Sequence, residues 1–134
     1  MKHVDVVAAV ITDGNKVLAA QRGYGELKGR WEFPGGKIEA GENDQEALIR
    51  EIQEEMNATI KVGKHLVTVD HRYPKIHITL KCYHCTLGEE KLTLKEHTGA
   101  EWHSFDELNN IDWCPADKKC VEAAHDTLRA IING

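Results

Sequence analysis

The sequence predicts an α/β fold in a single domain, residues 1–134, with a curved mixed sheet packed between at least two helices. Three observations support this prediction. The length of 134 residues is typical of one domain. Runs rich in β-branched residues alternate with segments of helical periodicity. Hydrophobic residues make up 41% of the chain and charged residues 29%, an ordinary balance for a globular protein.

The first part of the chain predicts a hairpin, a loop and two short strands. Residues 4–12 (VDVVAAVIT) favour a buried strand, and an Asp-Gly turn signal connects them to a second strand at 16–22. Three glycines indicate a loop at 23–30. Residues 31–43 (WEFPGGKIEAGEN) indicate a short strand, a Pro-Gly-Gly break and another short strand.

A helix is predicted next, followed by two long strands. The helical pattern extends to Met56 from Asn43, which is a suitable N-cap because Glu46 follows three residues later. Residues 59–73 and 75–87 alternate between polar and apolar side chains, as in two strands joined by a turn.

The end of the chain predicts a strand and a last helix. Residues 99–108 indicate a strand that leads into a helical turn. Residues 115–131 indicate one amphipathic helix, with Pro115 near its first position.

Composition and net charge limit the kinds of partner that we expect the protein to bind and indicate the compartment in which we expect it to work. A net charge of -5 argues against generic binding to nucleic-acid polymers or anionic membranes. No uncharged run approaches the ~18 residues of a membrane span, and Asp5 interrupts the first apolar run, so we expect no secretory leader. Four irregularly spaced cysteines do not form a disulfide framework, which favours a reducing cytoplasm.

Three carboxylates are crowded into residues 50–57 (REIQEEMN). At about 100° per helical residue, Glu51, Glu54 and Glu55 share one face roughly 100° wide, beside an apolar stripe. A solvated surface helix is the ordinary interpretation, with Arg50 pairing with Glu54. However, only one basic residue stands among six acids from position 42 to 55. A Pro-Gly-Gly turn also precedes the cluster, so these oxygens predict a site for Mg²⁺ or Mn²⁺ and suggest phosphate chemistry.

This region resembles the signature of the Nudix hydrolase family. The signature reads G-x5-E-x7-R-E-U-x-E-E-x-G-U, where U is apolar, and it matches here from Gly36 through Glu42 to Glu55. Only its tail departs, because Asn57 and Ala58 replace glycine and a larger apolar residue. Asparagine also tolerates the left-handed conformation that ends a helix, so we expect the turn to be kept.

The similarity covers nearly the whole chain. The segments WEFPGGKIEAGE, HITL, GAEW and PAD occur in the same order as in MutT-like proteins and CTP pyrophosphohydrolases. The resemblance implies a Nudix-type α/β/α sandwich, with a nucleoside triphosphate as the partner. It further implies hydrolysis to a monophosphate and pyrophosphate, by metal-assisted in-line attack of water at the β-phosphorus.

The resemblance also implies roles for particular residues. One glutamate of the cluster orients or deprotonates the attacking water, Arg50 orients the carboxylates, and Arg22 faces the phosphates. The implied ligands of Mg²⁺ or Mn²⁺ are the carbonyl of Gly35 and the carboxylates of Glu51, Glu54, Glu55 and Glu96, the last as a ligand or a base.

Two residues bear on the choice of base. Asp117 stands where MutT has an asparagine, and an ionised carboxylate only accepts hydrogen bonds, so it favours an exocyclic amine such as N4 of cytosine. A protonated Asp117 would also donate, and Asp117 is equally explained as a charge at a helix N-terminus. Ile76 replaces an arginine of MutT, which argues against a strict role in removing oxidised guanine. Trp31 offers a stacking face, although core packing explains it as well.

Other motifs favour structural roles. Cys82 and Cys85 form a CxxC in a predicted strand, where positions three apart face opposite sides, so we expect no zinc site there. We expect surface or packing roles for His71, His77 and His84.

Three alternatives to a cytosine-preferring enzyme remain. They are an 8-oxo-dGTP-removing enzyme, a catalytically silent nucleotide-binding module, and an enzyme acting on dinucleoside polyphosphates or nucleotide sugars. We expect a monomer or a homodimer.

Overall fold

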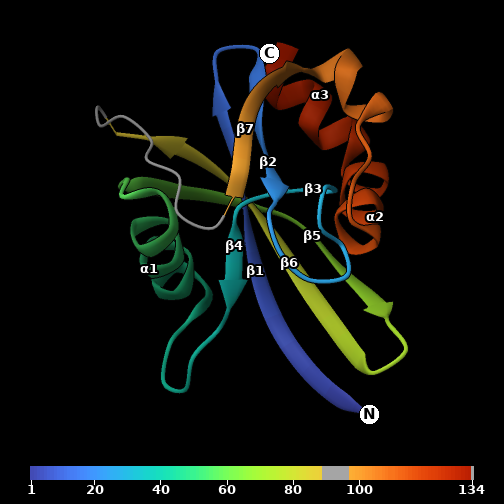
Figure 1. Ribbon diagram of the computed structural model, residues 1–134. Coiled ribbons are helices and arrows are strands. Elements are labelled where there is room, and N and C mark those ends of the chain that lie inside the picture. Colours follow the sequence, from blue (N-terminus) through green and yellow to red (C-terminus); the bar gives the residue numbers. More distant parts are fainter. Residues whose placement is uncertain (89–96, 134) are drawn as a thin grey trace.

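A mixed β-sheet forms the centre of the protein, with helix α1 on one face and helices α2 and α3 on the other (Figure 1). The computed structural model describes residues 1–88 and 97–133. The elements are β1 (Lys2–Asp13), β2 (Lys16–Arg22), β3 (Trp31–Glu32), β4 (Gly35–Lys37), α1 (Asp44–Met56), β5 (Ile60–Arg72), β6 (Ile76–Leu87), β7 (His97–Ser104), the 3-10 helix η1 (Phe105–Asn110), α2 (Pro115–Ala123) and α3 (His125–Asn133). This arrangement confirms the predicted fold class.

Strand β1 is the centre of the sheet. The strand order is β3-β2-β1-β6-β5, with β4 paired to β1 and β7 paired to β2. The predicted first hairpin is confirmed, because β1 and β2 are antiparallel and Thr12 lies opposite Val17. Gly14 in the connecting turn has a φ of 60°, a conformation that glycine adopts without strain.

Strands β5 and β6 form the second predicted hairpin. They are antiparallel, and register shifts occur on either side of His65. Such irregularities bend a strand and increase its twist, which agrees with the predicted curvature of the sheet. Strand β6 runs parallel to β1, so the two hairpins join into one sheet.

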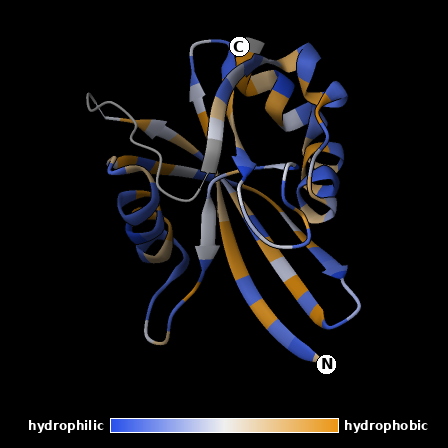
Figure 2. Ribbon diagram, in the orientation of Figure 1, coloured by the Kyte–Doolittle hydropathy of each residue, from blue (hydrophilic) through white to orange (hydrophobic). Residues whose placement is uncertain are grey.

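Each face of the sheet has its own hydrophobic core. Along β1, Ala8 and Val10 pack on the side of α2 and α3, whereas Val7 and Ile11 pack on the side of α1. Both faces are covered, which explains the nearly continuous apolar run in the sequence. Towards the N-terminus hydrophobic and hydrophilic residues alternate along β1 (Figure 2), because one face of this part is exposed.

Helix α1 begins and ends as the sequence predicts. The side chain of Asn43 accepts a hydrogen bond from the backbone of Glu46, whose own side chain accepts one from the backbone of Asn43. Asn57 ends the helix in the left-handed conformation, with φ 49° and ψ 42°. The predicted apolar stripe is buried except for Ile49, which is 44% exposed because it lies at the edge of the stripe.

The prediction of a single C-terminal helix is wrong. The chain leaves helical geometry at Ala124, with φ −97° and ψ 11°, and divides the segment into α2 and α3. Ala124 and Leu128 are both buried in the same core, and the His125 ring packs 4.8 Å from the Phe105 ring. Packing on η1 accompanies this break, and no glycine or proline marks it in the sequence. Among the described residues, no helix has the length and apolarity needed to span a membrane.

Candidate active site

A cavity of about 620 Å³ opens between β1, the β3–β4 segment, the β5–β6 turn and the start of α2. Its wall against the sheet is apolar and includes Val4, Ile76 and Ile78. Its polar groups include Arg22, Glu32, Glu55 and Asp117. A concave site with an apolar wall and a few converging polar groups is typical of small-molecule binding.

Two glycines bring the backbone against the carboxylates at one end of the cavity. A Cβ atom on Gly35 would collide with the backbone of Val7 and Ala8 in the neighbouring strand β1. A Cβ atom on Gly36 would collide with the carboxylate of Glu51. Position 35 requires glycine because this collision is with backbone atoms, whereas a side chain at position 36 would have to displace the Glu51 carboxylate. The Pro-Gly-Gly turn packs directly on helix α1.

Arg50 holds several carboxylates of this region in place. Its Nε donates to Glu42 Oε2 over 2.7 Å and its Nη2 donates to Glu42 Oε1 over 2.9 Å, which is a bidentate contact. Its Nη1 contacts Glu51 Oε1 at 2.8 Å and Glu54 Oε2 at 3.2 Å, and its Nη2 also donates to the carbonyl oxygen of Lys37. The hydrogen bond with Glu42 is the main cause that raises the pKa of Arg50 above its ordinary value.

The three predicted metal-binding glutamates differ in environment. Glu55 is 9% exposed and lines the cavity. The side chains of Glu51 and Glu54 are 15% and 61% exposed. Among the described residues, their carboxylates do not form a group with all ligand atoms within 4.8 Å of one another.

This donor set fits a hard divalent cation. All the candidate groups are oxygen donors, which suit Mg²⁺ or Mn²⁺ and not a softer metal. The glycine turn lets the backbone approach the Glu51 carboxylate, and Glu55 extends the acidic surface into the cavity. A cation bound here would lie beside the space in which a ligand fits.

Asp117, the residue that the sequence predicts to contact the base, lies in α2. It is 7% exposed, in the first turn of α2, and it lines the cavity. Burial, and then the negative charge of Glu32, raises the pKa of Asp117 well above its ordinary value, although a backbone hydrogen bond from Phe33 and the charge of Arg22 oppose this. This shift favours the protonated form of Asp117, which also donates a hydrogen bond, over the ionised form.

Arg22 connects the two ends of the cavity. Its Nη1 donates to Glu32 Oε1 over 3.0 Å, and its guanidinium lies 4.5 Å from the centre of the Tyr24 ring. Its Nε atom is buried and has no hydrogen-bond acceptor among the residues that the structure describes. A buried donor without an acceptor is costly, and a ligand oxygen would satisfy it.

The structure does not bring every predicted residue into the cavity. Trp31 is not among the residues that line it, and its ring packs edge-on 6.3 Å from His103 and against the core below α2. The neighbouring Glu32 faces the cavity instead, as the alternation of a strand requires. Glu96 lies outside the described residues, so its role stays a prediction.

Several cavity residues had no signal in the sequence. Glu32, Phe33, Tyr24 and Tyr73 all line the cavity. Glu32 and Phe33 lie within the WEFPGG segment, so adjacency to the glycine turn was the one feature that pointed to them. Tyr24 and Tyr73 come from a loop and from the β5–β6 turn, and only the folded chain brings them together.

Comparisons with known proteins agree with this geometry. The model of the NUDIX domain family matches residues 1–124. The CTP pyrophosphohydrolase of Escherichia coli (strain K12) is 35% identical over 124 residues, covering 92% of each chain. The putative 8-oxo-dGTP diphosphatase 2 of Mycobacterium tuberculosis (strain ATCC 25618 / H37Rv) is 39% identical over 127 residues, covering 92% of this chain and 89% of the relative. The solution structure of the E. coli ORF135 protein superposes with a TM-score of 0.83 at 34% identity, covering 98% of this chain and 94% of that one.

Proposed function

Because the chain belongs to the NUDIX domain family and is a nucleotide hydrolase, we propose that it is a Mg²⁺-dependent nucleoside triphosphate pyrophosphohydrolase that favours cytosine nucleotides. The observation that carries this proposal is the position of Asp117, in the same cavity as Glu55 and the Pro-Gly-Gly turn. A base at Asp117 and phosphates beside the acidic helix give a nucleotide one orientation.

The acidic helix and Arg22 are suited to the phosphate end. A Mg²⁺ ion bound by the carboxylates would neutralise phosphate charge and lower the pKa of a bound water. Arg50 contacts Glu51 and Glu54, and the Glu51 carboxylate lies against the Gly36 turn. Arg22 has a buried Nε donor available for a phosphate oxygen. One of the glutamates orients or deprotonates the water that attacks the phosphorus.

The protonated form of Asp117, which the raised pKa favours, suits the hydrogen-bonding edge of cytosine. Its carbonyl oxygen accepts from the N4 amine, and its hydroxyl donates to N3, so one side chain satisfies two base atoms. Ile76, with Val4 and Ile78 beside it, offers an apolar wall in place of a charged group. The relative named for CTP hydrolysis, 35% identical over 92% of both chains, supports the same preference.

Removal of 8-oxo-dGTP is the second candidate function. A neutral acid donates and accepts as an amide does, so Asp117 also fits the edge of an oxidised guanine. The 39% identical relative carries that activity in its name. A silent binding module is a weaker explanation, because it has no need for an acidic cluster whose members repel one another.

We also propose a cytoplasmic location. All four cysteines (Cys82, Cys85, Cys114 and Cys120) are buried free thiols. Free thiols are typical of a reducing compartment.

A nucleotide panel tests the proposal. Purified protein with Mg²⁺ is given CTP, dCTP, 5-substituted cytosine nucleotides, UTP, ATP, GTP and 8-oxo-dGTP, and the products are separated. We expect monophosphate and pyrophosphate, with the highest kcat/KM for a cytosine nucleotide. In ¹⁸O-labelled water the label should enter pyrophosphate, because attack at the β-phosphorus leaves the monophosphate oxygens untouched. No turnover of any nucleotide would contradict the enzyme, and a preference for 8-oxo-dGTP would select the second candidate.

A matched pair of variants tests the role of Asp117. Asp117→Ala should lower kcat/KM for CTP more than for the other nucleotides, because it removes both hydrogen bonds to the base. Asp126→Ala changes a fully exposed aspartate on α3 and should leave the ranking of nucleotides as it is. Equal effects of Asp117→Ala on all bases would assign Asp117 to folding alone.

A further inference from the structure

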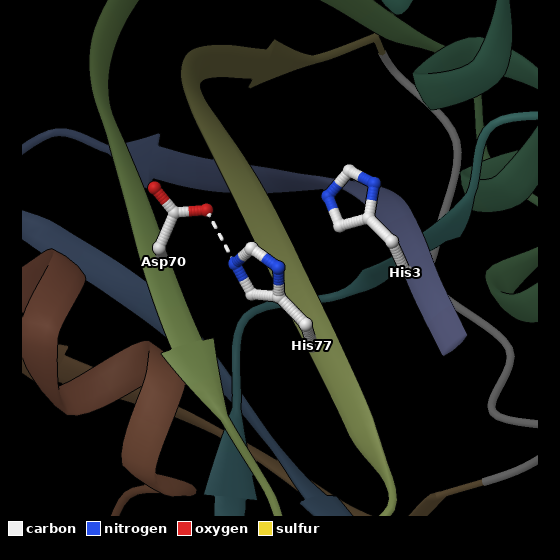
Figure 3. A group of neighbouring side chains, drawn as sticks. All are labelled: His3, Asp70 and His77. Carbon is white, nitrogen blue, oxygen red and sulfur yellow. Dashed lines mark hydrogen bonds and ion pairs between the residues drawn. The ribbon is translucent and has the colours of Figure 1, made fainter. Parts of the chain in front are cut away.

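Two histidines and an aspartate lie together on the sheet (Figure 3), and none of them lines the active-site cavity. His3 comes from β1, His77 from β6 and Asp70 from β5. One ligand atom of each lies within 4.8 Å of the other two. Among the side chains that the structure describes, no other three His, Cys, Asp or Glu residues meet this criterion.

Strand register brings these side chains to one face. His3 lies opposite His77 in the parallel β1–β6 pair, and Asp70 lies opposite Thr79 in the antiparallel β5–β6 pair. His77 and Thr79 are two residues apart on β6, so all four side chains point to the same side. This is the face that α1 covers further along β1, and His3 and Asp70 are exposed.

Hydrogen bonds already orient the group. Thr79 Oγ1 donates to Asp70 Oδ1 over 2.7 Å, and His77 Nε2 lies 2.9 Å from the same oxygen. His3 Nε2 lies 2.8 Å from Thr79 Oγ1 and 3.8 Å from Asp5 Oδ1.

We propose that His3, His77 and Asp70 form a second metal site, selective for Zn²⁺ or a similar borderline metal, with Asp5 as the nearest fourth donor. Two imidazole nitrogens with carboxylate oxygens suit Zn²⁺, whereas the acidic helix offers oxygens alone and suits Mg²⁺. The site would be distinct from the active site in both position and ligand chemistry.

The distances require only small side-chain movements. Ligand atoms about 2.0–2.1 Å from a tetrahedral Zn²⁺ lie roughly 3.3 Å from one another. His77 Nε2 and Asp70 Oδ1 at 2.9 Å need to separate slightly, and His3 needs to approach. Thr79 would remain a hydrogen-bond donor to Asp70 and keep that ligand oriented, as outer groups commonly do around metals.

A bound Zn²⁺ would connect three strands. His3 lies near the start of β1 and His77 near the start of β6, while Asp70 lies near the end of β5. These are the ends of three paired strands beyond the helix-covered core. Binding to the folded state alone would raise the melting temperature with Zn²⁺ concentration.

Metal titration of the full chain tests this site. Metal-free protein is titrated with ZnCl₂ in a calorimeter, in an excess of Mg²⁺ that occupies the acidic helix. We expect one tightly bound equivalent of Zn²⁺. His3→Ala and His77→Ala should each weaken the affinity by at least about tenfold, since each removes a ligand. His125→Ala, on α3, is the matched control and should bind Zn²⁺ like the wild type.

Two measurements distinguish Zn²⁺ binding at His3 and His77 from binding at another histidine or at the acidic helix. In ¹⁵N spectra of the eight histidines, Zn²⁺ should shift the ring nitrogens of His3 and His77 and leave those of His125 unchanged. Glu54→Gln should keep the Zn²⁺ affinity, because Glu54 belongs to the acidic helix. Equal affinity in the wild type and both histidine variants, or no bound Zn²⁺, would show that the group is only a hydrogen-bonded network.

Discussion

The carboxylate of Glu51 occupies the space in which a side chain at Gly36 would lie. The two residues are adjacent in space because β4 pairs with β1 and packs on α1. The Pro-Gly-Gly turn and helix α1 therefore pack as one unit. The observed position of Glu51, a predicted metal ligand, depends on the absence of a side chain at position 36.

Gly36→Ala should abolish most activity. The new Cβ would displace the Glu51 carboxylate and disturb its contact with Arg50, so kcat should fall by roughly 100-fold, as for loss of one electrostatic group. Steady-state kinetics with CTP measure this loss. Gly99→Ala is the control, because a Cβ there meets nothing within 4 Å of the described residues, and it should retain activity. An active Gly36→Ala enzyme would show that Glu51 is not needed in this position.

Glu54→Gln tests the metal role of the acidic helix. The side chain is 61% exposed, so the substitution should leave the melting temperature nearly unchanged. It should nevertheless lower kcat by at least roughly 100-fold and raise the Mg²⁺ concentration needed for half-maximal rate. Glu122→Gln is the control, because it removes the same charge at an exposed position of α2, and it should retain activity. Full activity of Glu54→Gln would exclude this residue as a metal ligand.

Asp117 should make stability depend on pH. Its pKa is raised in the folded state by burial, whereas an unfolded aspartate titrates near 3.9. Above that pH the unfolded chain loses its proton and the folded chain keeps it, so the free energy of unfolding falls as pH rises towards the folded pKa. Asp117→Asn removes this effect.

Thermal unfolding of the wild type and Asp117→Asn at several pH values measures it. The two melting temperatures should be similar near about pH 4 and should diverge towards about pH 8, with the asparagine variant the more stable. A difference that stays constant across this range would mean that Asp117 is ionised in the fold.

Asn57 should tolerate glycine better than alanine. Its φ of 49° is unfavourable for a residue with an ordinary Cβ, and its Oδ1 accepts a hydrogen bond from Gln53 over 3.0 Å. Asn57→Ala should lower the free energy of unfolding by about 1 kcal/mol, and Asn57→Gly should stay within about 0.5 kcal/mol of the wild type. Urea denaturation measures both. Equal stability of the two variants would contradict a conformational role for position 57.

The sequence predicts the local elements correctly where their signals lie within a few residues of one another. The capping of α1 by Asn43 and Glu46 and the Asp-Gly turn of the first hairpin depend on neighbours within a few residues. The break at Ala124 could not be predicted, because the segment is a continuous helical pattern and the packing of His125 on Phe105 that accompanies the break is a contact between distant residues.

The candidate site was readable in part for the same reason. The spacing of Glu51, Glu54 and Glu55 on one helix turn follows from helical geometry alone. The raised pKa of Asp117 could not be predicted from the sequence, because it depends on burial and on Glu32 from another element. Trp31 was assigned to the base from its position beside the glycine turn, and the alternation of β3 directs Glu32 to the cavity instead.

The sequence by itself determined the family, the order of the elements and the acidic helix with its caps, since each follows from spacing along the chain. Only the tertiary structure decided which side chains share a space. It joins Arg22, Glu32 and Asp117 in one cavity, and it places His3 beside Thr79 and His77 although 76 residues separate His3 from Thr79. The physical reason is strand register, which fixes contacts between distant residues and leaves no periodic trace in the sequence.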